Sequence, residues 1–580
     1  MSDQNAILDA LKAEGNSLFQ EGEFSAAYKK YTEAIDKRPS GNTLAVLYSN
    51  RAACALKLKD YLDAIYDGQQ ATNADPSFVK AFVRTATAAD AINLSSISHA
   101  TWTSASKLVK ESDPALYAEF TSRAKAAETA RSKHEARLEE NREDYIIELS
   151  TSRARKEMPW ARAMMMRNRL PEQSSGHVII EAYQEFMEGI ETLKQLELQE
   201  QPDGTVMVRA VGKVLEPLTN AILMHDHVFH VDFPDFQEKI KHQISAEVQT
   251  HDGWGLVGPQ DLIREMPERL QTSGWQVTRP AVTITLRAWI LRAFVDANFG
   301  KTATADEFYR RVLDVLEWGA RTYANVPKAE RGAVFEPTFI RGVRALRLSN
   351  VLGLYKRQRL EDNPETETEE EGIECRYTLE DIRQLALDAK SEVEASEPPP
   401  PYASTAFRLA FWSYPLGEAL GVLGWYHMRR GMKLQGPEPD EASVLASIPE
   451  FKRSAEHYVK SAEAYPIDEQ QHFTMLLFAL EAYWRGGAPL RITIPLAQRA
   501  RGAYARASEI WRLTLTQHEI AKAAEATSFL KECEMQMIKG AWKLDDAFGP
   551  THYDPGYKRV PRAEEDEEEL DVSDIDGDSE

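Results

Sequence analysis

The sequence predicts an all-α protein in which helical hairpins recur along most of the chain. Three observations indicate this fold class: a repeat of about 34 residues near the N-terminus, a glycine-free stretch rich in Ala, Glu, Lys and Arg, and a return of helical periodicity after residue 283. With 580 residues, 43% of them hydrophobic, the chain has room for three or four folded units. We expect an N-terminal three-unit solenoid, a long connecting helix, and a larger body of divergent helical repeats with at most a short β element.

The N-terminal repeat is defined by where small residues, aromatic residues and prolines fall. The first unit carries Gly15, Ala27, Tyr31, Ala34 and Pro39, the second carries Ala52, Ala64, Ala71 and Pro76, and the third begins with Val79, Phe82 and Ala86. Small residues are needed where paired helices approach closely, and proline closes a unit because it cannot continue a helix. The third unit then degrades, as expected of a terminal repeat.

Five polar residues are distributed over the first helices of the three units. Lys12 and Asn16 are four apart, Lys80 and Arg84 are four apart, and Asn50 lies on the helix between them. Residues at i and i+4 share a helix face, so each pair points one way. Cations with amide side chains along one groove suit a ligand with a terminal carboxylate and an acidic side chain, because arginine can hold a carboxylate bidentately.

These segments resemble a known family of domains. Leu11 to Asn16, Tyr48 to Ala52 and Lys80 to Arg84 are similar to the dicarboxylate-clamp tetratricopeptide-repeat (TPR) domains of co-chaperones and chaperone adaptors. The resemblance covers about residues 5–112 and implies a partner, the acidic C-terminal peptide of Hsp70- or Hsp90-type chaperones, held by Lys12, Asn16, Asn50, Lys80 and Arg84. It says nothing about the remainder of the chain, which we expect to hold a client or second partner.

Turn residues and charge runs set the expected domain limits. We expect a TPR clamp domain (1–112), a connecting helix and linker (113–176), a mostly helical middle domain (177–360), an acidic linker (361–376), a helical repeat-like domain (377–545) and a disordered acidic tail (546–580). The connecting helix should run from about 114 to 157. Residues 205–211 are a candidate short strand, and the four prolines 398–401 should form a stiff extended turn.

Charge and cysteine usage restrict the class of protein. The net charge is −22, but residues 361–374 and 564–580 carry eight and eleven acids without a base, and so supply 19 of those 22 charges. An acidic balance argues against nucleic acid as a partner. Three distant cysteines exclude a disulfide framework and fit a reducing compartment. Neither a signal pattern nor a membrane span is evident, so we expect a cytoplasmic protein, with the nucleus as the alternative.

One cluster favours a different class of function. Three histidines and two aspartates fall between residues 225 and 232. The candidate ligands for zinc or iron are His225, His227, His230 and Asp232. On a strand, His225 and His227 would share one face, while His230 and Asp232 would share the opposite one. That geometry opposes a single metal centre, and surface or core histidines are the favoured interpretation.

Other catalytic patterns are incomplete. Gly300-Lys301-Thr302 resembles the end of a phosphate-binding loop, but Val295 stands where the required glycine should be, so an interhelix turn is favoured. We therefore expect a non-enzymatic protein without a cofactor. Three functions remain open: a co-chaperone-like adaptor, a TPR scaffold for another acidic peptide, and a metal enzyme at the histidine cluster.

Overall fold

The computed structural model describes residues 2–140, 152–200, 206–209, 212–231, 233, 235–255, 257–360, 377–436 and 439–550. In this part of the chain the fold is all-α apart from one two-stranded hairpin. The predicted acidic linker (361–376) lies outside the described residues, as does most of the predicted tail, from residue 551 on.

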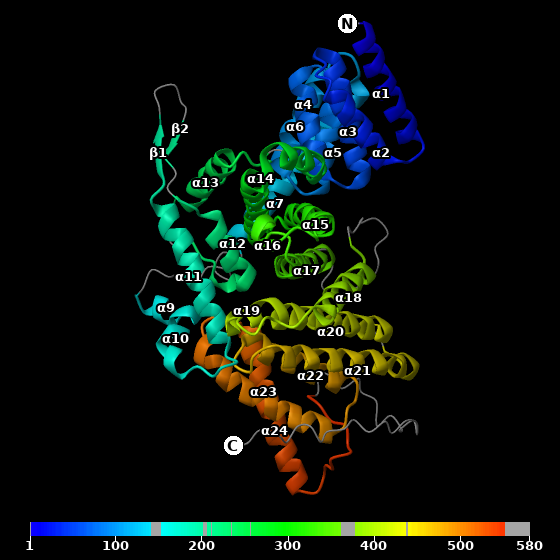
Figure 1. Cartoon of the computed structure of the whole chain (residues 1–580). Coiled ribbons are helices and arrows are strands. Elements are labelled where there is room, and N and C mark those ends of the chain that lie inside the picture. Colours follow the sequence, from blue (N-terminus) through cyan, green and yellow to red (C-terminus); the bar gives the residue numbers. More distant parts are fainter. Residues whose placement is uncertain are drawn as a thin grey trace.

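The N-terminal solenoid consists of three helical hairpins, and Figure 1 shows them at one end of the molecule. The helices are α1 (Ser2–Gln20), α2 (Phe24–Ile35), α3 (Gly41–Leu58), α4 (Tyr61–Ala74), α5 (Val79–Ala91) and α6 (Ser95–Val109). The repeat pattern has a direct packing reason at Gly15. A Cβ there would lie 2.8 Å from the Tyr31 ring, so only glycine lets α1 and α2 approach this closely.

The helix α7 (Pro114–Glu140) extends the solenoid by packing on α6. Phe120 and Ala124 of α7 join a cluster with Trp102 of α6, and the Trp102 and Phe120 rings are 5.2 Å apart. The sequence predicted one connecting helix to about residue 157. In the structure α7 is followed by α9 (Ser152–Glu157), and residues 141–151 between them are outside the described part.

The middle of the chain begins with α10 (Pro159–Met166), with Pro159 in its first turn, and a short 3-10 turn, η1 (Arg167–Arg169). The elements that follow are α11 (Ser175–Lys194), β1 (Glu197–Glu200), β2 (Val206–Arg209), α12 (Leu215–Met224), η2 (Asp226–Val228), α13 (Phe236–Thr250), α14 (Pro259–Asn298), α15 (Thr302–Thr322), α16 (Lys328–Arg331) and α17 (Pro337–Leu360).

Two of these elements bear on the sequence-based expectations. The predicted short strand is present as β2, and it pairs antiparallel with β1, which the sequence pattern did not reveal. Gly300, with φ +77°, turns the chain between α14 and α15, so Gly300-Lys301-Thr302 is an interhelix turn. Helix α14 is itself broken at Gly274, where φ is +66°.

The C-terminal part consists of long helices joined by short turns. They are α18 (Leu379–Ala395), α19 (Thr405–Arg408), the π-helical turn η3 (Leu409–Ser413), α20 (Tyr414–Gln435), α21 (Glu441–Ala464), α22 (Gln470–Arg485), α23 (Leu490–Trp511) and α24 (Gln517–Ile538). Three of these helices begin with reciprocal capping boxes, made by Thr378 with Asp381, Asp440 with Ser443, and Thr516 with Glu519.

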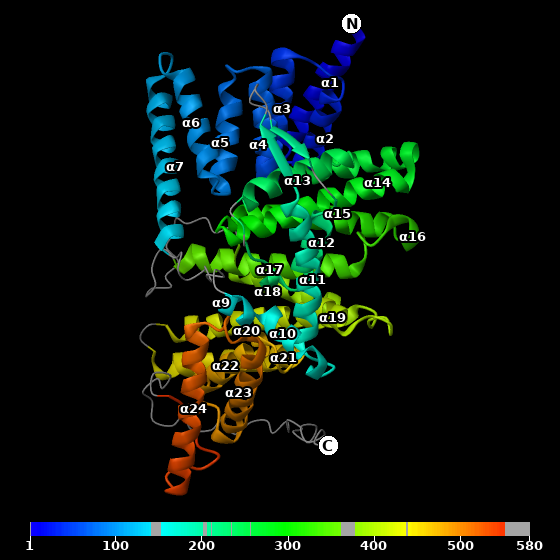
Figure 2. The same cartoon turned by 90° about the vertical axis from the view of Figure 1, so that its left-hand side faces the viewer.

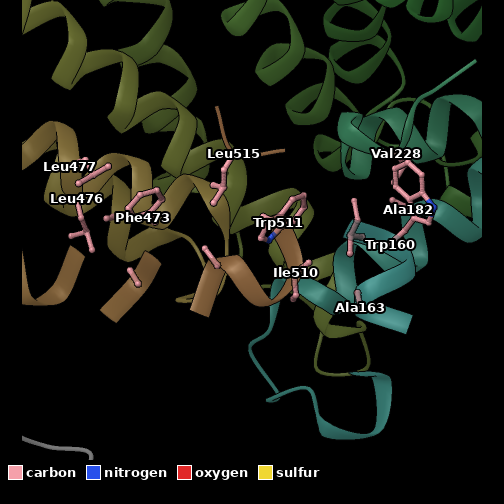
Figure 3. Packing of buried hydrophobic residues seen from close by; sticks show 14 of the residues in the cluster. Trp160, Ala163, Ala182, Val228, Phe473, Leu476, Leu477, Ile510, Trp511 and Leu515 are labelled. Atoms are coloured by element: carbon pink, nitrogen blue, oxygen red, sulfur yellow. The ribbon is translucent and has the colours of Figure 1, made fainter. Parts of the chain in front are cut away.

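The helices stack in chain order into an elongated column, which Figures 1 and 2 show from two sides. The solenoid lies at one end, α14, α15 and α17 come next, α18, α20 and α21 follow, and α22–α24 close the other end. Helix α11 crosses several of these layers, and α10 packs between α11 and α23. Trp160, Ala163 and Ala182 from α10 and α11 belong to the same buried cluster as Ile510 and Trp511 at the end of α23 (Figure 3).

No helix in the described ranges has both the length and the apolar character required to cross a bilayer.

Candidate peptide-binding site

The structure places the five predicted site residues on three neighbouring helices of the solenoid. Lys12 and Asn16 lie on α1, Asn50 on α3, and Lys80 and Arg84 on α5. Each helix is the first of its hairpin, and the repeat stacks them in order. The side chains of α1, α3 and α5 can therefore meet although 34 or more residues separate them in the sequence.

Three of the five side chains form one chain of hydrogen bonds. The Asn50 amide donates to Asn16 Oδ1 at 3.3 Å, and Arg84 Nη1 donates to Asn50 Oδ1 at 3.5 Å. Both ends of the chain are held by further groups: the Tyr31 hydroxyl donates to Asn16 Oδ1 at 2.8 Å, and Arg84 Nη1 donates to Ser49 Oγ at 2.6 Å. Asn16, Asn50 and Arg84 therefore line a single surface of the solenoid.

The two lysines stand beside this chain without joining it. Lys12 precedes Asn16, and Lys80 precedes Arg84, by one helical turn each. Lys12 is partly exposed and Lys80 is exposed, and neither makes a hydrogen bond or ion pair with another residue in the described ranges. Their ammonium groups are thus available to an incoming anion.

The charge of Arg84 is not neutralised within the solenoid. Its guanidinium is partly buried, and burial lowers its pKa. The ionisable groups that oppose this shift are Cys54 and Tyr31, and burial raises the pKa of each of these to about 12. Both are neutral at neutral pH, so Arg84 is a partly desolvated cation with neutral hydrogen-bond partners. Such a cation is stabilised when a carboxylate arrives.

Arg51, the residue after Asn50, has the opposite environment. It is buried and donates to both carboxylate oxygens of Asp67, at 2.7 and 2.8 Å, and to Thr32 at 3.0 Å. Burial alone would lower its pKa, but Asp67, Tyr28 and Asp261 together outweigh that effect and the pKa is raised. On α3, therefore, Arg51 is neutralised by Asp67, whereas the adjacent Asn50 contacts Arg84, which has no carboxylate partner among the described residues of the solenoid.

The solenoid also docks onto the body of the protein. Asp60 at the start of α4 pairs with Arg310 of α15 at 2.8 Å, and Asp63 of α4 pairs with Arg311 at 2.5 Å. Arg51 approaches Asp261 of α14 at 3.7 Å. Sequence reasoning missed this interface as well as the contacts of Ser49 and Tyr31. Ser49 does lie next to the predicted site residue Asn50, and Tyr31 is itself a repeat position, but nothing in the sequence pairs α4 with a helix about 250 residues away.

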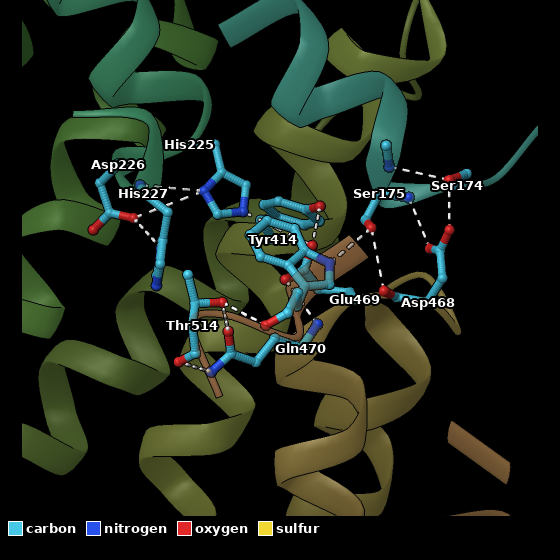
Figure 4. A network of polar contacts seen from close by, with 12 residues as sticks. Ser174, Ser175, His225, Asp226, His227, Tyr414, Asp468, Glu469, Gln470 and Thr514 are labelled. Carbon is cyan, nitrogen blue, oxygen red and sulfur yellow. Dashed lines mark hydrogen bonds and ion pairs between the residues drawn. The ribbon is translucent and has the colours of Figure 1, made fainter. Parts of the chain in front are cut away.

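The histidine cluster does not assemble as the strand hypothesis assumed. His225 ends α12, and Asp226 and His227 lie in the turn η2 rather than on a strand (Figure 4). His227 Nδ1 lies 3.0 Å from Asp226 Oδ1, and one candidate ligand atom from each of these three consecutive residues lies within 4.8 Å of the others. Asp232 is outside the described residues.

His230 lies in a different environment. Its Nδ1 lies 2.8 Å from the Val228 carbonyl, and its ring stacks on Trp160 with centroids 4.8 Å apart. His225 in turn stacks on Trp511 at 5.0 Å, with Nε2 3.8 Å from Glu469. Both imidazoles therefore pack against aromatic side chains, and His225 links the middle of the chain to its C-terminal helices. Three ligands from consecutive residues are a poor match to the tetrahedral sites of zinc enzymes.

The chain matches no model of a known protein family. Sperm-associated antigen 1A from Danio rerio is 42% identical over 90 residues, which make up 15% of this chain and 21% of that protein. DnaJ homolog subfamily C member 7 from Mus musculus is 41% identical over 80 residues (14% and 16% of the two chains), and the heat shock protein sti1 homolog from Schizosaccharomyces pombe is 40% identical over 93 residues (15% of each). The chain thus spans about a fifth or less of the relatives it matches.

Among solved structures, yeast Tom70 is 12% identical with a TM-score of 0.24, over 92% of this chain and 97% of that one. The myosin chaperone UNC-45 from C. elegans, in complex with an Hsp90 peptide, is 13% identical with a TM-score of 0.24, over 90% and 59% of the two chains.

Proposed function

We propose that this protein is a co-chaperone-like adaptor whose solenoid binds the acidic C-terminal peptide of an Hsp70- or Hsp90-type chaperone. The observation that carries the proposal is Arg84, a partly buried cation whose hydrogen-bond partners are neutral. The helical body would hold a client or a second partner, and the complex would form in the cytoplasm. Neither a cofactor nor a catalytic step is part of this function.

The five side chains offer donors for two carboxylates. Arg84 donates through Nη1 to Ser49 and Asn50, which leaves its Nη2 and Nε groups to face a ligand carboxylate. Lys80, one turn away on the same helix, can contribute a second cation to that carboxylate. Lys12 and the amide of Asn16, on α1, are placed to hold the other carboxylate or the peptide backbone.

The curated relatives support this proposal by their names. A DnaJ homolog and a heat shock protein sti1 homolog are each about 40% identical to the chain over 80 to 93 residues. That length is close to three helical hairpins. The relatives are matched over a small share of their length, so they support only the peptide-binding part of the proposal.

The expected affinity is modest. A hydrogen bond to a charged group contributes about 1.5–3 kcal/mol, and several of them must offset the cost of ordering a flexible peptide. A net binding free energy of about −7 to −8 kcal/mol, or about micromolar, is therefore reasonable.

Isothermal titration of the full chain with a chaperone C-terminal peptide tests the proposal. The peptide is used as the free acid and as the C-terminal amide. We expect Arg84→Ala and Lys80→Ala each to weaken binding of the free acid at least tenfold, and amidation of the wild-type ligand to do the same. Lys29→Ala, an exposed lysine on the neighbouring helix α2, is the matched control and should bind normally. Unchanged affinity in the Arg84 and Lys80 variants would contradict the proposal that these residues bind a carboxylate of the peptide.

A scaffold for a different acidic peptide is the second candidate, since the same donors would accept any pair of carboxylates. An acidic peptide of equal charge but unrelated sequence distinguishes the two. If it binds as tightly as the chaperone peptide, the scaffold is favoured and the specific chaperone partner is wrong.

A further inference from the structure

The connection between α18 and α19 presents an unusual exposed aromatic residue. Four consecutive prolines, Pro398–Pro401, are followed by Tyr402, whose side chain is 90% exposed. The other aromatic residue among the exposed large apolar side chains of the described ranges is Phe299, at 37%. Most aromatic side chains of this protein pack into the core, so Tyr402 is directed to solvent by its position in the loop.

Both ends of this loop are fixed to the body. The Trp412 indole donates to the Glu397 carbonyl at 3.1 Å, just before the prolines. After them, Ser404 caps α19 by accepting from the Phe407 N–H at 3.1 Å and donates to Glu181 of α11 at 3.2 Å. The proline loop therefore projects from a defined place on the column, beside α11 and α19 (Figure 2).

The prolines also limit the conformations of the loop itself. Proline fixes φ near −65° and favours polyproline II geometry, which has three residues per turn and no internal hydrogen bonds. Residues three apart then share a face, so Pro399 and Tyr402 can point the same way. The Ala403 N–H donates to the Pro400 carbonyl at 2.9 Å and closes a turn with Pro401 in its second position, where proline is favoured. The fixed φ of each proline limits the conformations open to the loop before any partner binds, so less conformational entropy is lost on docking.

We propose that Pro399-Pro400-Pro401-Tyr402 is a docking motif for a WW-type domain. Such domains bind proline-rich ligands in an aromatic-lined groove that accepts the polyproline II ridge. A Pro-Pro-x-Tyr sequence supplies a proline pair for the groove and a tyrosine for an adjoining pocket, and here that tyrosine is the exposed one. Figure 1 shows α19, which follows the motif, in the middle of the column, with the layer of α14, α15 and α17 between it and the peptide-binding solenoid, so both partners can be bound at once.

The flanking residues favour a WW-type domain over an SH3 domain, the other common reader of proline helices. SH3 ligands pair their prolines with a nearby arginine or lysine. The five residues before Pro398 and the five after Tyr402 contain no cation, and Glu394 and Glu397 are acidic. Docking in a fully extended form would break only the Ala403–Pro400 hydrogen bond, whose groups would then face solvent or the partner.

Fluorescence anisotropy with the full chain and a labelled recombinant WW domain, of the class that takes Pro-Pro-x-Tyr peptides, tests the proposal. We expect saturable binding that weakens at least tenfold in Tyr402→Ala and in Pro399→Ala. Met165→Ala, which shortens another exposed apolar side chain (68% exposed), is the matched control and should bind as the wild type does. Lys80→Ala should also keep this binding, so the result is independent of the chaperone-peptide proposal.

Two outcomes would overturn the inference. One is the absence of saturable binding to such WW domains, or binding that Tyr402→Ala leaves unchanged. The other is binding to an SH3 domain but not to a WW domain. Circular dichroism of the loop variants should match the wild type, because Tyr402 is exposed and Pro399 is only partly buried in a loop outside the helices.

Discussion

Asp60 of α4 and Arg310 of α15 form an ion pair at 2.8 Å although 250 residues separate them in the sequence. Together with the neighbouring pair Asp63–Arg311, this contact fixes the solenoid on the body. The solenoid is therefore not suspended from a linker, and the surface that carries Asn16, Asn50 and Arg84 has a set direction. A peptide bound to this surface would be held in a defined position relative to the helical column.

The two arginines near the candidate site should respond differently to the same substitution. Arg51→Met leaves Asp67 buried without its partner, and loss of one member of a buried pair costs about 3–5 kcal/mol. Arg84→Met removes a cation that lacks a carboxylate, so stability should change by no more than about 1 kcal/mol while peptide binding is lost. Hydrogen–deuterium exchange of α3 and α4 in the full chain measures the change in stability for each of the two variants. Equal protection in the two variants would contradict this prediction.

The contact between Asp60 and Arg310 should give the protein a measurable pH dependence. Burial raises the pKa of Asp60 from 3.8 to about 6, against the opposing effect of Arg310. The folded state therefore binds this proton more tightly than the unfolded state, and the resulting stabilisation is present at low pH and lost as the pH rises through about 6. The asparagine of Asp60→Asn cannot ionise, and Asp60 makes no capping hydrogen bond that the substitution would lose. The stability of Asp60→Asn relative to the wild type should therefore rise by about 1–3 kcal/mol between pH 5 and 8.

Thermal unfolding of wild type and Asp60→Asn at several pH values checks this expectation. The difference in Tm should increase toward high pH. A difference that stays constant from pH 5 to pH 8 would show that Asp60 is ionised throughout.

Substitution of Gly15 should disturb both the packing of the first repeat and peptide binding. A Cβ on Gly15 would lie 2.8 Å from the Tyr31 ring, and the Tyr31 hydroxyl holds Asn16. Gly15→Ala should therefore displace the ring, cost about 1–3 kcal/mol of stability, and weaken peptide binding several-fold. Gly353→Ala is the matched control, because nothing lies within 4 Å of its Cβ position in α17, and it should stabilise the chain by about 0.5–1 kcal/mol.

Salt should weaken the proposed peptide complex through the lysines in particular. Lys80 is exposed and Lys12 partly exposed, so their attraction to a carboxylate is screened within about 10 Å at 0.1 M salt. Titrations from 0.05 to 0.5 M NaCl should show a loss of roughly tenfold or more in affinity. The loss should be smaller in Lys80→Ala. A salt-independent affinity would argue that carboxylates are not the groups recognised.

The sequence by itself determined the features that depend on neighbouring residues. The spacing of Gly15, Ala27 and Tyr31 specifies how one hairpin packs, and the repeat then places Asn50 between α1 and α5, because each unit encodes its contact with the next. The return of helical periodicity after residue 283 likewise indicated helices where α14 and α15 lie, and Gly300 marked the turn between them.

Only the tertiary structure decided how distant segments meet. The pairing of α4 with α15, the stacking of His225 on Trp511 and the neutral surroundings of Arg84 depend on surfaces that fit only after separate helices have packed. A local pattern records which side of a helix is apolar, but many partners can cover an apolar side. The choice among them comes from shape and charge complementarity across the whole column, which no short stretch of sequence contains.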